Sequence, residues 1–213
     1  MFPFGTMLSL TPRFVRYLLL PVTYLVFLTG FLISGAIFYR SRPFDVKAAI
    51  LSDLQSPDDN PHGYGAAAAG TAISAILLTP AVAWFYGRLR QGHPKLALAG
   101  AAMFAMGLAA AVGIGILAPF THGYTPLHIE LASAAFIGIS AGTWIHLLAA
   151  RAARGILIFQ LGALIVLVFL CYGPVEFDNS RLFTSLAFWE WVLCANCGLA
   201  LWTLTGACAP RLD

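Results

Sequence analysis

The chain has 213 residues, of which 60% are hydrophobic and 10% are charged. A typical soluble domain has about 45–50% apolar and about 25% charged residues, so this composition excludes an ordinary soluble globular protein. The 12 Lys and Arg residues exceed the 9 Asp and Glu residues by only three, which is too little positive charge for a nucleic-acid-binding surface. We therefore expect an integral membrane protein with no nucleic-acid partner.

Six apolar windows follow one another along the chain. Each is long enough to cross a bilayer, for which about 20 residues are needed. None shows the period-two alternation of a transmembrane β-strand, so helices are favoured over a barrel. The expected fold is an all-α bundle of six transmembrane helices that forms a single domain over residues 1–213. The predicted spans are residues 17–39, 66–86, 96–119, 127–149, 155–172 and 182–206.

Basic residues predict the orientation, because Lys and Arg are enriched in cytoplasmic loops. Eight of the 12 basic residues fall at one end of the predicted bundle and four at the other. The larger set is Arg13, Arg16, Arg88, Arg90, Lys95, Arg151, Arg154 and Arg211, and the smaller set is Arg40, Arg42, Lys47 and Arg181. Both termini are therefore expected in the cytoplasm, and the membrane is a plasma membrane or, for a bacterial protein, the inner membrane.

The longest segment between spans, residues 40–65, is then external. It is rich in the Asp, Asn, Pro and Gly residues that form consecutive turns. We expect an ordered loop folded over the external end of the bundle, with a short helix over residues 46–54. A solvated linker is the alternative interpretation.

Small residues recur at four-residue spacing in two spans, a pattern that lets helix backbones approach closely in lipid. One stripe is Gly107, Ala111 and Gly115, and the other is Ala134, Gly138 and Gly142. We expect both stripes to face neighbouring helices.

Acidic and histidine side chains gather at the predicted external end, and ionisable groups inside spans point to function because they are costly there. Glu190 is expected about 12 Å below the external boundary, at about 1.5 Å per residue. Glu130 lies near His128 at the start of the fourth span, whereas His146 is expected to pack or to reach the interface at its other end. The candidate ligand-binding residues are Asp53, His62, His128, Glu130, Glu190 and Trp191.

Three interpretations of this polar cluster stay open. A cavity at the leaflet boundary would hold the polar end of a lipid or lipid-like ligand. Alternatively, His62, His122 and His128 would bind zinc, and the protein would be a metal-dependent lipid hydrolase or acyltransferase with Asp53 or Glu190 as acid or base. In the third interpretation the acids brace loops, and the protein is a structural or assembly subunit whose partner is another membrane protein or a second copy.

Other reactive side chains fit no catalytic pattern. Ser52 lies beside Asp53 but lacks a G-x-S-x-G turn, so a turn or cap role is expected for it. Cys194 and Cys197 form a CxxC inside a span, where free Cys usually acts as a small apolar residue. Cys208, near the cytoplasmic face, is a weak candidate for palmitoylation.

The order of these features resembles the DRAM family of six-span proteins, which includes autophagy modulators and proteins that remodel GPI-anchor lipids. The resemblance is carried by the turn ILSDLQSPDD at residues 50–59, the histidine and small residues at 128–142 and the Trp-Glu-Trp at 189–191. Residues that match the family pattern are Ser52, Asp53, His128, Glu190 and Trp191, whereas Leu54 and Gln55 stand where the family has Gly. The chain is also similar to small bacterial six-span proteins with a Ser-Asp-Leu turn. The resemblance implies a role linked to membrane lipids.

A more distant similarity is to the membrane hydrolases that include alkaline ceramidases and adiponectin-receptor-like proteins. Those enzymes use Ser, Asp and three His around zinc, with a late His-x-x-x-His. This chain has no histidine after His146. The hydrolase interpretation therefore ranks second.

Overall fold

A computed structural model describes residues 10–41, 43–45, 51–120, 125–151 and 181–208, together with residues 155, 158–159, 161–162 and 165–166. Every regular element within these residues is a helix, as the composition predicts. The long helices are α2 (Leu20–Phe38), α4 (Tyr64–Leu89), α5 (Pro94–Leu117), α6 (Pro126–Ala149) and α8 (Leu186–Ala207). The short elements are α1 (Pro12–Phe14), the π-helix η1 (Val15–Leu19), α3 (Leu51–Gln55) and the 3₁₀ turns η2 (Tyr39–Ser41), η3 (Ala118–Phe120) and η4 (Leu182–Thr184).

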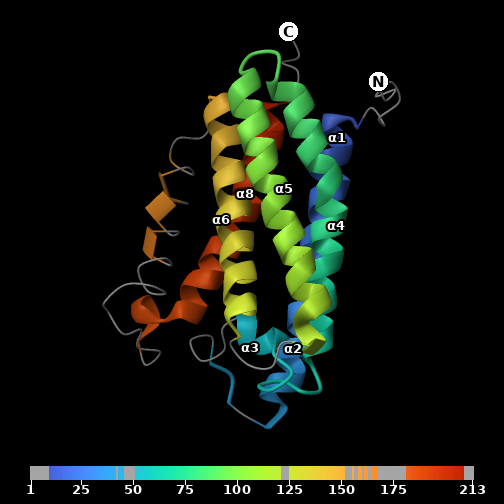
Figure 1. Cartoon of the computed structure of the whole chain (residues 1–213), viewed down its shortest axis with the longest axis vertical. Helices are drawn as coiled ribbons and strands as arrows, with labels where there is room; N and C mark the ends of the chain where they lie inside the picture. The colour runs from blue at the N-terminus through green and yellow to red at the C-terminus, as the bar shows by residue number, and fades with distance from the viewer. Residues whose placement is uncertain are drawn as a thin grey trace.

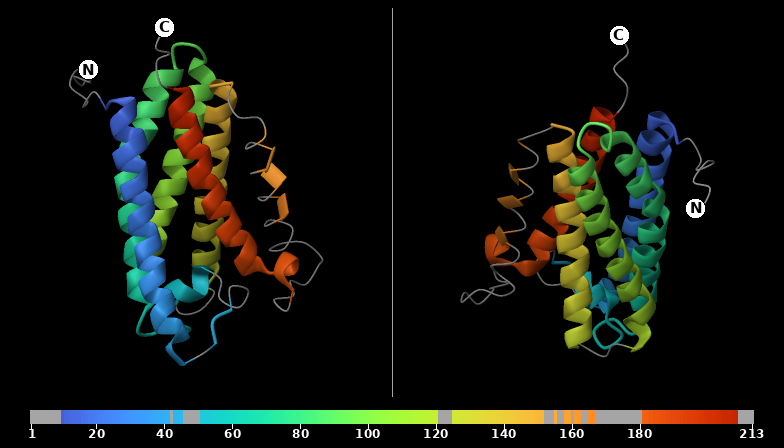
Figure 2. Two further views of the ribbon diagram at one scale, coloured as in Figure 1. Left: turned by 180° about the vertical axis from the view of Figure 1, so that it is seen from behind. Right: turned by 45° about the horizontal axis from the view of Figure 1, so that its top comes forward.

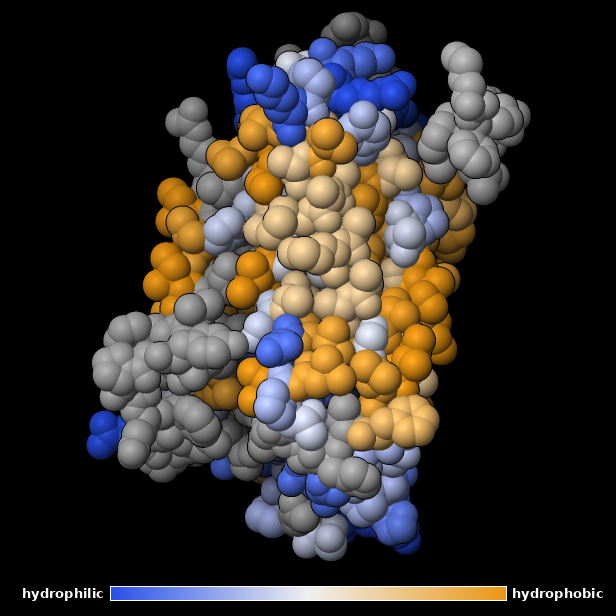
Figure 3. All heavy atoms as spheres, viewed as in Figure 1, coloured by the Kyte–Doolittle hydropathy of each residue, from blue (hydrophilic) through white to orange (hydrophobic). Residues whose placement is uncertain are grey.

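The prediction of a multi-pass membrane protein is confirmed by five helices long and apolar enough to cross a bilayer among the described residues. These spans are Pro12–Ser41, Tyr64–Leu89, Pro94–Phe120, Pro126–Ala149 and Leu186–Ala207. The predicted fifth window, 155–172, lies largely outside the described residues, so the count of six stays a prediction. A broad apolar belt covers the middle of the bundle, and hydrophilic residues gather at its two ends (Figure 3).

The long helices stand side by side, with α4, α6 and α8 running in one direction and α2 and α5 in the other (Figure 1). Helix α5 packs between α4 and α6, α2 packs on α4, and α8 contacts α6 and, less extensively, α2. Helix α1 begins and α8 ends at the same end of the bundle, here called the terminal end (Figure 2). The opposite end holds α3 and the starts of α4 and α6, and is called the α3 end (Figure 1).

Glycines set the close spacing between neighbouring helices. A Cβ on Gly107 of α5 would lie 2.5 Å from the backbone nitrogen of Ile139 on α6, and one on Gly138 would lie 2.7 Å from the Gly107 Cα. Gly107 and Gly138 of the predicted stripes therefore bring α5 and α6 together, whereas Gly115 faces α4, where a Cβ would lie 2.5 Å from the Ala68 carbonyl oxygen. A second close pair, Gly30 and Gly70, joins α2 to α4 and was not predicted, since a Cβ on Gly30 would lie 2.6 Å from the Ala66 carbonyl oxygen.

The first span contains a wide turn before its long helix. Pro21 has no N–H to donate to the preceding turn, and the backbone N–H of Leu20 instead reaches back five residues to the Val15 carbonyl. This π-helical turn, η1, precedes the regular helix α2. It lies beside the end of α8, where the Arg16 guanidinium stands 4.9 Å from the Trp202 ring.

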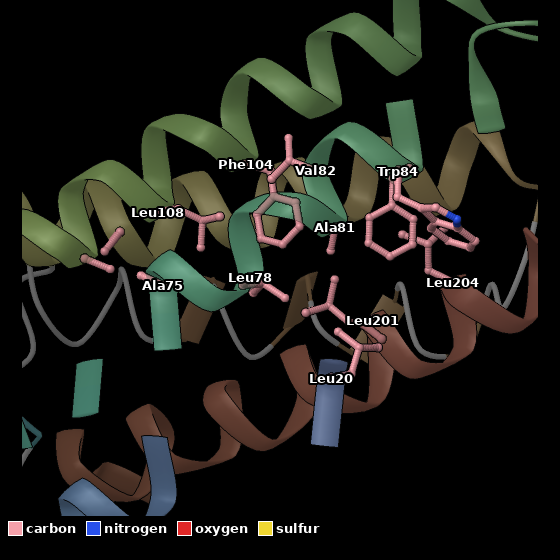
Figure 4. Packing of buried hydrophobic residues seen from close by; sticks show 14 of the residues in the cluster. Leu20, Ala75, Leu78, Ala81, Val82, Trp84, Phe104, Leu108, Leu201 and Leu204 are labelled. Carbon is pink, nitrogen blue, oxygen red and sulfur yellow. The ribbon is translucent and has the colours of Figure 1, made fainter. Parts of the chain in front are cut away.

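The main hydrophobic cluster lies between α2, α4, α5, α6 and α8. Phe104 and Leu204 are fully buried within it, and Leu20, Leu78 and Leu201 pack against them from the surrounding helices (Figure 4). The indole N–H of Trp84 donates to the Leu10 carbonyl at 2.9 Å, which ties the start of the chain to α4.

Candidate functional site

The segment after the first span folds into the α3 end of the bundle. Leu51 and Leu54 of α3 are 5% and 3% exposed and pack with Phe31, Ala67 and Trp191. The expected helix over residues 46–54 is observed as Leu51–Gln55, and residues 46–50 lie outside the described residues. Two apolar residues spaced three apart therefore let one short helical turn insert among the spans.

Buried hydrogen bonds hold this turn in place from several helices. The Ser34 hydroxyl of α2 donates to the Leu54 carbonyl at 2.7 Å, and the Asn60 amide donates to the Ser34 hydroxyl at 2.7 Å. The Gln55 amide nitrogen donates to the Thr71 hydroxyl of α4. Hydrogen bonds from Ser34, Asn60 and Gln55 thus hold the segment inside the bundle.

Glu190 anchors the start of α3. Its Oε2 accepts a hydrogen bond from the Leu51 backbone N–H at 2.7 Å, and the side chain is 6% exposed. Because α8 begins at Leu186 after the η4 turn, and not at residue 182, Glu190 lies about 6 Å below the start of its helix rather than about 12 Å. Asp53 of α3 is close enough to interact with it electrostatically.

The structure brings some predicted site residues together and separates others. Trp191 packs edge-on against Phe31 at 5.7 Å between ring centroids, beside α3. His128 is buried in the first turn of α6, whereas His62 and Glu130 are exposed. No described residue forms a hydrogen bond or ion pair with the side chain of His62, His128 or Glu130. Of the expected polar cluster, only Glu190 and Asp53 therefore lie close together, beside Leu51 of α3.

A metal centre finds no support in the described residues, among which no group of three His, Cys, Asp or Glu side chains could hold a metal ion. Of the three proposed ligands, His62 and His128 belong to no such group. His122 lies outside the described residues.

A cavity of about 640 Å³ occupies the middle of the bundle, within the range of about 300–1,000 Å³ that is typical of small-molecule sites. Residues of α2, α3, α4, α5, α6 and α8 line it, and none of the described side chains that line it is charged. Its walls are mostly aliphatic and aromatic, and its polar groups include Ser52, Gln55 and Thr71 at the α3 end. The sequence pattern did not reveal it, because no single helix carries more than a part of the wall.

The cavity reaches the side of the bundle between α2 and α8. Among its lining residues Pro21 on α2 and Ala195 and Leu199 on α8 are exposed, Leu199 by 53%. Between these helices the Tyr24 hydroxyl donates to the Cys194 carbonyl, and the Tyr24 ring lies against Gly198. The two helices touch at such points without packing along their length.

His146 does not reach the interface as one interpretation held. It is fully buried between Phe85 and Phe104, with its Nε2 at 3.4 Å from the Ala97 carbonyl oxygen. Its ring lies against Gly100, where a Cβ would come within 2.7 Å of the imidazole Cδ2. The packing alternative for His146 is therefore correct.

Cys194, Cys197 and Cys208, the described cysteines, form no disulfide. Cys194 and Cys197 line the cavity, and the Cys197 Sγ lies 3.7 Å from the Ser140 hydroxyl. Burial raises the pKa of Cys208 to about 11, against a smaller opposing effect of Arg88. Its thiol is therefore protonated near neutral pH, which makes it a poor nucleophile for acylation.

No family model, no curated protein and no solved structure matches the chain. The resemblance to the DRAM family stays a prediction carried by the residues quoted for it.

Proposed function

We propose that this membrane protein binds a lipid-like ligand in the cavity of its bundle. The observation that carries the proposal is the cavity itself, about 640 Å³ in volume and with no charged side chain among the described residues that line it. A packed bundle leaves few voids larger than a water molecule, so a space of this size indicates an occupant. The apolar walls suit a hydrocarbon chain, and the polar residues at the α3 end suit a polar end group.

The opening between α2 and α8 supports access from the lipid. The exposed lining residues Pro21, Ala195 and Leu199 lie within membrane-spanning segments, so a molecule entering there comes from the bilayer and not from water. At the α3 end, buried Leu51 and Leu54 close the bundle toward the loops. A ligand that exchanges sideways with the membrane would itself be hydrophobic.

Glu190 has a positioning role in this proposal. By accepting the Leu51 N–H it holds α3, and α3 presents Ser52 and Gln55 to the cavity. Trp191 packs in the same cluster as Leu51 and Leu54 of this turn. His62, His128 and Glu130, which were expected to orient the ligand, do not line the cavity.

A cavity-filling substitution tests the proposal. Ala111 of α5 lines the cavity and is 5% exposed, so Ala111→Phe should fill part of the space that the ligand occupies. The matched control is Ala109→Phe, because Ala109 lies on the exposed face of the same helix. Mass spectrometry of lipids retained by purified protein should show a ligand in the wild type and the control and its loss from Ala111→Phe. Equal retention, or no specific lipid in any of the three proteins, contradicts the proposal.

We further propose that the terminal end is cytoplasmic. The described basic residues at this end are Arg13, Arg16, Arg88, Arg90, Lys95 and Arg151, against Arg40 and Arg181 at the α3 end. This distribution follows the enrichment of Lys and Arg in cytoplasmic loops. The polar end of the cavity would then lie in the outer leaflet, with membrane lipids as the partners.

A further inference from the structure

We infer that the ligand is an uncharged lipid-like molecule that ends in a hydroxyl group, recognised by Ser52 and Gln55 of α3. This inference rests on the proposed function and adds the chemical class of the ligand. It depends on which hydrogen-bonding atoms the α3 end leaves unused and on where the charges near the cavity lie.

Two polar atoms at this end have unused hydrogen-bonding capacity. The Ser52 side chain is half-buried and lines the cavity, and its hydroxyl forms no hydrogen bond with any described residue. Gln55 donates its amide nitrogen to the Thr71 hydroxyl and, at 3.5 Å, to the Ala67 carbonyl, which identifies that end of the side chain as the NH₂ group. The Gln55 carbonyl oxygen accepts no hydrogen bond within the described part of the chain.

This pair of atoms matches a hydroxyl group. Ser52 and Gln55 are three residues apart on one helical turn, so their side chains share a face. A ligand hydroxyl donates one hydrogen bond and accepts others, and would donate to the Gln55 carbonyl while it accepts from Ser52. A carbonyl group would use only Ser52, and a hydrocarbon end would use neither.

Charge near the cavity disfavours an ionic end group. Within the described part of the chain no Lys, Arg or His lines the cavity, so no described side chain there would act as counter-ion to a buried anion. Asp53 of α3 lies beside this end and would repel an anion, and Glu190 is the other acid near it. Neither acid lines the cavity, so an ammonium group there would also lose its hydration without a direct partner.

The cavity is long enough to hold an extended chain behind the hydroxyl. Its lining residues on α2 run from Leu20 to Phe31, about 16 Å of helix at 1.5 Å per residue. Trp202 lines it from α8, near the terminal end. A chain anchored at Ser52 therefore places its far end close to an intrinsic fluorophore.

The test uses four probes with the same alkyl chain. One end of this chain is brominated, and the other end carries a methyl, hydroxyl, phosphate or trimethylammonium group. Each is titrated into phosphatidylcholine nanodiscs holding the full chain, and bromine quenching of Trp202 is read, with Trp202→Phe identifying the signal. We expect the hydroxyl probe to bind about five- to tenfold more tightly than the methyl probe, and the charged probes to bind more weakly than the hydroxyl probe.

Ser52→Ala should weaken the hydroxyl probe about fivefold and leave the methyl probe unchanged. The control Ser41→Ala, at an exposed residue, should change neither. Tightest binding of a charged probe, or an equal effect of Ser52→Ala on both probes, overturns the hydroxyl assignment and leaves the proposed cavity ligand standing. If no probe quenches Trp202 more in the wild type than in Ala111→Phe, the proposed function fails as well.

Discussion

At the scale of single residues, Glu190 shows how a costly buried acid takes a structural role. Its carboxylate meets the backbone N–H at the start of a five-residue helix, a group that has no partner within such a short element. The acid therefore fixes where α3 begins and, through α3, the face that Ser52 and Gln55 present to the cavity.

This anchoring predicts unequal effects of two substitutions. Glu190→Gln keeps an oxygen that can accept the Leu51 N–H, so it should change stability little. Glu190→Leu removes the acceptor and leaves a buried N–H unpaired, which should lower the free energy of unfolding by about 1–3 kcal/mol. Thermal unfolding of both variants in one detergent measures the difference. Equal stability of the two variants would contradict the anchoring role.

At the scale of elements, contacts between helices depend on small residues at particular turns. Gly107 and Gly138 bring α5 and α6 into backbone contact, and Gly30 and Gly70 do the same for α2 and α4. In lipid, where apolar side chains gain little from leaving the solvent, such close packing supplies much of the association between helices. By contrast, α2 and α8 have no comparable stripe, which explains why the cavity opens between them.

Gly107→Ala and Gly35→Ala should therefore have effects of opposite sign. A Cβ on Gly107 would meet the backbone of α6 at 2.5 Å, and the required shift should cost about 1–3 kcal/mol. A Cβ on Gly35 meets nothing within 4 Å, so the better helix propensity of Ala should stabilise the protein by up to about 1 kcal/mol. Thermal unfolding of both variants in the same detergent checks the signs, and destabilisation of the same size in both would remove the special role of Gly107.

At the scale of the whole molecule, the bundle has two unlike ends. The terminal end carries most of the described Lys and Arg residues. The α3 end carries the buried polar network around Ser34, Gln55 and Asn60 and closes one end of the cavity. Because the middle of the molecule is apolar, these ends determine how it lies in a bilayer (Figure 3).

The proposed orientation is tested by labelling exposed residues at the two ends. In a chain whose native cysteines are replaced, Asp58→Cys lies at the α3 end and Gln91→Cys at the terminal end, and both positions are exposed. A membrane-impermeant maleimide should label Asp58→Cys in intact cells, and should label Gln91→Cys only after the membrane is opened. The reverse pattern would place the terminal end outside.

Much of the fold was predictable, because an apolar segment long enough to cross a bilayer must satisfy its own backbone hydrogen bonds and therefore forms a helix. The Gly107 and Gly138 stripes were predictable as contacts for a similar reason, since small residues at helical spacing form one face. The Gly30 and Gly70 pair was missed, although Ala66, Gly70 and Ser74 repeat at the same four-residue spacing, because the spacing does not say which small residues of two helices meet. Ser52 was visible in the sequence, but only as a turn residue.

By itself, the sequence determined that the chain is helical and belongs in a membrane, because composition and window length depend on the chain alone. It also indicated where charges collect, since the order of spans assigns each loop to an end. Only the tertiary structure decided that Glu190 meets the Leu51 N–H, that His62 and Glu130 are exposed, and that a cavity with mostly apolar described walls exists. The physical reason is that a cavity and its polar end are formed jointly by helices that are distant in the sequence, so no local pattern records them.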